Sequence, residues 1–131
     1  CMHPLFRWAR EIPPSVKAVA YMHHQETATC PIDCPMILNS EPKFEDVVNF
    51  ILRGEFLITN TYHGAYWGTI LGRKVIVISP FSNKFYHFKH PPFIMQDSNL
   101  ESAFDLAKSY PDALEECQTA NIQFYETVKE L

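Results

Sequence analysis

The residues best suited to chemistry form one polar turn, Asn60-Thr61-Tyr62-His63-Gly64. It follows the apolar run 56–58 and precedes small and aromatic residues, so we expect it between a buried strand and a helix. The start of a helix offers unpaired backbone N–H groups and a partial positive charge, which suit a phosphate or a carboxylate. His63 can donate to such an anion or carry a proton near neutral pH, and Gly64 lets a ligand approach the backbone closely.

A purely structural role is the alternative for the same turn. Threonine and asparagine are common helix caps, so Asn60 and Thr61 could serve the helix alone. In that interpretation His63 is a hydrogen-bonded histidine of the core. The residue types leave both interpretations open.

The elements that position this turn follow from hydrophobic patterning. Gly72 ends the segment after the turn, and Val75-Ile76-Val77-Ile78 is a second apolar, β-branched run. Strand, helix, glycine stop and strand form a β-α-β unit of a parallel sheet buried on both faces. The turn lies at the carboxyl end of the first strand, where open α/β sheets bind their ligands.

The rest of the chain continues this alternation. We expect strands at 16–22, 36–38 and 93–95, and a helix with apolar residues at 44, 47, 48, 51 and 52 along one face. We expect Ser40 to cap that helix, with Pro42 in its first turn. A capping box at 98–101 predicts a helix to about residue 109, and a final helix starts near Pro111. Residues 1–131 therefore predict one Rossmann-like, three-layer α/β domain with a mainly parallel sheet.

Composition limits the classes of function. The chain has 131 residues and a net charge of -4, which suits one domain and argues against nucleic-acid binding. No apolar run approaches the roughly 20 residues that span a bilayer, so we expect a cytoplasmic location. The chain begins with Cys1 in place of an initiator methionine, and we treat it as a fragment of a larger protein. Its four cysteines are too few for a disulfide scaffold, and we expect reduced thiols.

A zinc site at His23, His24, Cys30 and Cys34 is the metal-binding alternative. Adjacent histidines on an extended chain point in divergent directions, and paired ligand knuckles are absent. We therefore expect no metal, and no other cofactor.

The segment Ile58–Ile78, followed by Pro80 and Ser82-Asn83-Lys84, resembles the C-terminal domain of the polysaccharide pyruvyl transferase family. That family shows a strand, a Ser-Arg-Leu-His-Gly-like turn, a helix ending in Leu-Gly, a strand and a downstream lysine. The resemblance covers about residues 43 to 90. It implies a GT-B-like architecture of two Rossmann-type domains around a cleft, in which this chain supplies the C-terminal domain.

The resemblance also implies roles for single residues. His63 and Gly64 match the family's His-Gly, which is implicated in binding the anionic donor, and we assign His63 the catalytic role. Lys84 matches the later lysine, a phosphate contact. Thr61 stands at the position of the family's arginine, which removes a bidentate partner for a carboxylate or phosphate. The donor-binding residues that we predict are Asn60, Thr61, Tyr62, Gly64, Ser82 and Lys84.

The function expected from these residues is a transferase step in surface polysaccharide biosynthesis, for a capsule or an exopolysaccharide. The donor is phosphoenolpyruvate or, in a GT-B glycosyltransferase, a nucleotide sugar, and the acceptor is a glycan. A lipid-linked acceptor would bring the protein to the inner face of the membrane, and the base that activates it is expected on the missing N-terminal domain. A non-catalytic glycan-binding or assembly module of the same fold is the alternative from another class.

Overall fold

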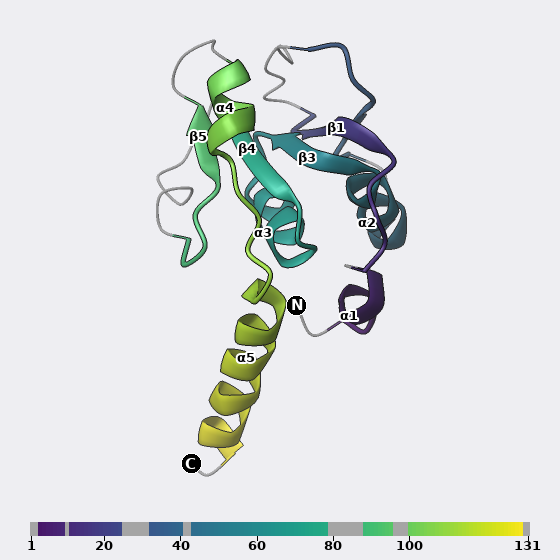
Figure 1. The fold of residues 1–131 in the computed structure, drawn as a ribbon. Helices are drawn as coiled ribbons and strands as arrows, with labels where there is room; N and C mark the ends of the chain where they lie inside the picture. The colour runs from purple at the N-terminus through teal and green to yellow at the C-terminus, as the bar shows by residue number, and fades with distance from the viewer. Residues whose placement is uncertain are drawn as a thin grey trace.

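A computed structural model describes residues 3–9, 11–24, 32–40, 43–78, 88–95 and 100–129. The described strands form one parallel sheet in the order β2-β1-β3-β4-β5, and helices lie on both of its faces (Figure 1). This arrangement confirms the predicted Rossmann-like α/β fold. The elements, in chain order, are α1 (Leu5–Ala9), β1 (Val16–Met22), β2 (Met36–Leu38), α2 (Phe44–Leu52), β3 (Gly54–Thr59), α3 (Tyr62–Ile70), β4 (Lys74–Ile78), β5 (Phe93–Met95), α4 (Leu100–Leu106) and α5 (Ala113–Lys129).

Alternate residues of the central strands enter two separate apolar cores. Leu57 of β3 packs in the core shared with α1, α2, α3 and the start of α5. Its neighbours Phe56 and Ile58 pack in the core on the opposite face, which α4 covers through Ala103. Burial of both faces explains why these strands are apolar without interruption.

The strand order creates a point where the chain leaves two neighbouring strands in opposite directions. The chain passes from β1 outward to β2, whereas β3 is followed by α3 and then β4 on the other side. Ile32 and Cys34, in the connection after β1, pack into the α4-side core, while α3 lies on the opposite face. In open α/β sheets such a switch point opens a crevice at the carboxyl ends of the strands, and ligands bind there.

Close packing holds α3 against the sheet. A Cβ atom on Gly68 would lie 2.7 Å from Leu57 Cδ2 and 2.8 Å from Val75 Cγ2, so only glycine fits at this position without a shift. α3 therefore lies directly on β3 and β4, and its first residue, Tyr62, stands three residues after the end of β3.

Two helix boundaries differ from the prediction. α2 starts at Phe44 with extended Lys43 at the N-cap, so the expectation that Ser40 caps this helix is wrong. The acidic residues Glu45 and Asp46 complement the helix dipole in its first turn instead. α4 ends at Leu106, short of residue 109. Pro42 and the first residues of the predicted capping box lie outside the described residues.

α5 runs away from the rest of the domain (Figure 1). Its first turn is buried through Ala113 and Leu114, whereas Phe124 and Tyr125 are 70% and 66% exposed. Within the described residues, no helix combines the length and the apolar character that a bilayer crossing demands.

Candidate functional site

Polar residues that follow three neighbouring strands are joined at the carboxyl edge of the sheet. The main-chain N–H of His23, after β1, donates to Asn60 Oδ1, after β3, at 2.8 Å. Asn39, after β2, accepts through Oδ1 from the main-chain N–H of His24 at 3.0 Å and from its ring Nδ1 at 2.8 Å. The β1/β3 switch point is thus bridged by hydrogen bonds.

The rings of His23 and His24 stack, with centroids 4.8 Å apart and planes 17° apart. The expectation that adjacent histidines diverge is therefore wrong here, because the chain has left the extended strand at Met22. The described residues contain no cluster of three or more His, Cys, Asp or Glu side chains able to hold a metal ion. Cys30 lies outside the described residues.

The buried hydroxyls of Thr59 and Thr61 are used by the fold. Thr59 donates to the carbonyl oxygen of Tyr21 at 2.6 Å, and its oxygen accepts from the main-chain N–H of Thr61 at 3.0 Å. The hydroxyl oxygens of Thr59 and Thr61 are 2.9 Å apart. Because the Thr59 hydroxyl already donates its proton to Tyr21, the Thr61 hydroxyl donates to Thr59. Thr61 also accepts from the main-chain N–H of Gly64 at 3.0 Å and so caps α3.

Gly64 is required by packing within the domain. A Cβ atom there would meet Thr61 Oγ1, and it would lie 2.7 Å from Tyr21 Cδ2 and 2.8 Å from Thr59 Oγ1. The sequence suggested that Gly64 makes room for a ligand, but the space beside its Cα atom is filled by these three side chains.

His63 and Tyr62 lie on the solvent side of the same turn. His63 is exposed, with its ring 5.6 Å from that of Trp67, so it is not a core histidine. Tyr62 is 39% exposed and stacks on Phe88 at 4.8 Å. Of the predicted site residues, Asn60 to Gly64 form one continuous turn, whereas Ser82 and Lys84 lie outside the described residues.

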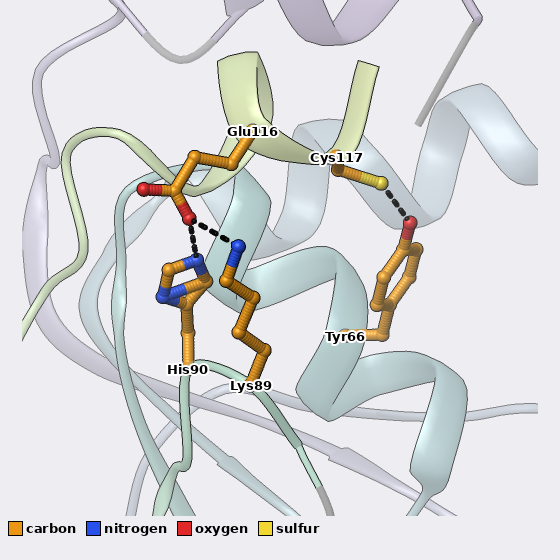
Figure 2. A network of polar contacts seen from close by, with 5 residues as sticks. All are labelled: Tyr66, Lys89, His90, Glu116 and Cys117. Carbon is orange, nitrogen blue, oxygen red and sulfur yellow. Dashed lines mark hydrogen bonds and ion pairs between the residues drawn. The ribbon is translucent and has the colours of Figure 1, made fainter. Parts of the chain in front are cut away.

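A second polar cluster joins α5 to the segment before β5 and to α3 (Figure 2). Glu116 Oε2 lies 3.2 Å from Lys89 Nζ and 2.7 Å from His90 Nε2. The Tyr66 hydroxyl bonds Cys117 Sγ, and burial is the main cause that raises the pKa of Tyr66. The sequence did not point to Glu116, because its partners lie more than twenty residues away.

Cys117 is disulfide-bonded, so the expectation of reduced thiols is wrong at this position. The small number of cysteines predicts reduced thiols. Spacing along the chain does not reveal which cysteines approach one another in space, so the sequence could not predict this disulfide.

No family model, curated protein or solved structure matches this chain.

Proposed function

We propose that this chain is the donor-binding domain of a pyruvyl transferase-like enzyme of surface polysaccharide biosynthesis. The observation that carries the proposal is the position of the α3 start beside the β1/β3 switch point. Helix starts favour phosphate, and switch points are where open α/β domains bind ligands. The resemblance assigns its anionic donor to the same His-Gly pair.

The residues of the turn have two roles in this proposal, to hold the turn in place and to contact the donor. Asn60 and Thr61 hold the turn in place through their hydrogen bonds to His23 and Gly64. Exposed His63 then contacts the donor phosphate and stabilises charge on the leaving group, with Tyr62 beside it. Ser82 and Lys84 complete the donor site in this proposal.

The reaction transfers the donor carbon to an acceptor hydroxyl of a glycan. With a nucleotide sugar, one acceptor oxygen bonds to the anomeric carbon as the nucleoside diphosphate leaves. With phosphoenolpyruvate, two acceptor oxygens bond to C2, inorganic phosphate leaves, and the methylene carbon takes up a proton to become a methyl group. The acceptor's proton passes to a base that we place on the N-terminal domain of a two-domain, GT-B-like protein. The donor is phosphoenolpyruvate or a nucleotide sugar.

An NMR titration tests donor binding. Phosphoenolpyruvate and uridine diphosphate glucose are added separately to the labelled chain, and we expect saturable amide shifts at Tyr62, His63 and Gly64 with one of them. His63→Gln should weaken binding, whereas Glu126→Gln, a change at an exposed position of α5, should leave it unchanged. Absence of shifts at the turn with every donor would contradict the proposal.

A non-catalytic glycan-binding module is the second candidate. It is favoured by Thr61, which stands in place of the family's arginine and whose hydroxyl oxygen caps α3 by accepting from the Gly64 N–H. This alternative predicts that oligosaccharides shift the amides of the turn while phosphorylated donors do not.

The proposal places the domain in the cytoplasm, at the inner face of the membrane where a lipid-linked acceptor is presented. Thiols are kept reduced in that compartment, so the proposal predicts that the Cys117 disulfide of the structure does not persist in the cell. Alkylation of thiols in intact cells, followed by mass spectrometry of the chain, reports the state of Cys117. A persistent disulfide at this residue would contradict the cytoplasmic location.

A further inference from the structure

A cavity of about 200 Å³ lies between α3, α5 and the segment before β5. Figure 2 shows the polar side chains at this junction. The proposed donor site, at the start of α3, is formed by other residues. The cavity is lined by Tyr66, Thr69, Ile70, Phe88, Lys89, His90, Ala113, Glu116, Cys117 and Ala120.

Small residues on α5 create this space. Ala113 and Ala120 are seven residues apart, so they lie on one face of the helix, two turns from each other. Larger side chains at these positions would fill the gap between the helices. On the opposite wall Thr69 donates its hydroxyl to the carbonyl oxygen of Ala65 at 2.8 Å, which leaves its methyl group for an apolar ligand.

The polar groups of the cavity favour a ligand that brings a hydrogen-bond donor. Lys89 Nζ and His90 Nε2 both contact Oε2 of Glu116. Neither contact uses Oε1 of that carboxylate, and Figure 2 shows this oxygen turned away from both side chains. The Glu116 carboxylate therefore keeps hydrogen-bond acceptor capacity beyond its contacts with Lys89 and His90.

The volume of the cavity, which is partly open to solvent, matches a single ring. An apolar cavity of roughly 150 Å³ in another protein holds benzene. The present one is slightly larger, so it admits one aromatic ring with one small substituent. Lys89, with a side chain 77% exposed, and Glu116, at 42%, are accessible from solvent, so a ligand meets Glu116 without unfolding of the domain.

We propose that this cavity is a binding site for a single-ring aromatic compound that carries one hydroxyl donor, such as a phenol. The ring lies against Ile70, Phe88 and the two alanines, and the hydroxyl donates to Glu116 Oε1. The site shares no residue with the proposed donor site, and Phe88 of its wall stacks on Tyr62 of that site.

Titration of the whole chain with phenol, toluene and benzoate, followed by NMR of backbone amides and methyl groups, tests this site. Phenol should give saturable shifts at Ile70, Ala113 and Ala120. Toluene, which lacks the donor, should bind at least about tenfold more weakly, as expected for one hydrogen bond to a charged group. Benzoate, which offers no hydrogen-bond donor, should also bind at least about tenfold more weakly than phenol.

Two substitutions and a matched control complete the experiment. Ala120→Leu should weaken phenol binding about tenfold or more by filling the cavity, whereas Thr119→Leu, at the adjacent exposed position, should not. Glu116→Leu should bring the affinities of phenol and toluene close together. Equal binding of phenol and toluene by the unaltered chain, or no saturable binding of phenol, would overturn the proposal. So would phenol binding that Ala120→Leu leaves unchanged in a folded chain.

Discussion

The main-chain N–H of His23 donates to the side-chain Oδ1 of Asn60 at 2.8 Å, and this bond joins the ends of β1 and β3. Asn60 is fully buried, so the partner that it offers to His23 cannot readily be replaced by water. The bond fixes the path of the chain after β1 relative to the turn that opens α3. It therefore sets the shape of the proposed donor site without contacting a donor.

Substitution of Asn60 should cost stability. Asn60→Leu removes the acceptor and should lower the free energy of unfolding by about 1–3 kcal/mol, because the part-buried N–H group of His23 loses its bond to Asn60. Asn49→Leu, on the exposed side of α2, is the matched control and should change stability by less than about 0.5 kcal/mol. Urea denaturation followed by circular dichroism measures both. Equal effects of the two changes would argue against a structural role for the bond.

The packing around Gly64 predicts that even one added methyl group is harmful. Gly64→Ala forces Thr61, Thr59 and Tyr21 apart and should lower stability by about 1–3 kcal/mol, although alanine is the better helix former. The neighbouring His63→Ala changes an exposed side chain and serves as the control. Thermal unfolding measures the stability of both variants. A Gly64→Ala protein more stable than the unaltered chain would contradict the packing argument.

Arg73 links two distant segments at the opposite edge of the sheet. It is only 6% exposed, and Nη2 donates to the carbonyl oxygens of Leu52 at 2.8 Å and Ile12 at 2.5 Å. Burial lowers the pKa of this guanidinium, which nonetheless stays charged at neutral pH.

Arg73→Met should therefore destabilise the domain by about 1–3 kcal/mol, because buried carbonyl oxygens lose their donor. Arg53→Met, at an exposed position, is the control for loss of one positive charge. Chemical denaturation measured at two salt concentrations separates the lost hydrogen bonds from general electrostatics. Similar losses in both variants would show that net charge, and not the buried contact, is responsible.

Three tyrosines predict loss of stability in alkali. Burial raises the pKa of Tyr21, Tyr66 and Tyr110 above the ordinary value of 10.0. Below about pH 10 these tyrosines are protonated in both states and their contribution to stability is complete. As the pH rises further, the unfolded chain releases the protons first, so the free energy of unfolding falls until the folded-state pKa values are passed.

Tyr66→Phe should make this alkaline decline shallower, while Tyr125→Phe, at a position 66% exposed, is the matched control. The free energy of unfolding is measured by urea denaturation at a series of pH values from 8 to above 10. A decline that both substitutions reduce equally would contradict a specific contribution of the buried Tyr66 hydroxyl.

The sequence by itself determined the local elements and the fold class. The apolar runs at 56–58 and 75–78, with the glycine stop at Gly72, predicted the β-α-β unit and the turn at 60–64, because hydrophobic periodicity is a property of neighbouring residues. Helix boundaries were predicted less accurately than the elements themselves. Ser40 is a residue type that often caps a helix, but α2 begins at Phe44 and has Lys43 at its N-cap.

Tertiary structure alone decided the strand order, the switch point and the partners of the polar side chains. His23 and Asn60 are 37 residues apart, and Tyr66 and Cys117 are 51 apart, so no local pattern relates them. The same holds for the cavity, which exists because Ala113 and Ala120 of α5 face Ile70 of α3. The sequence shows which chemical groups each side chain carries. Which of these groups meet, and which already form hydrogen bonds within the fold, depends on how distant segments pack together.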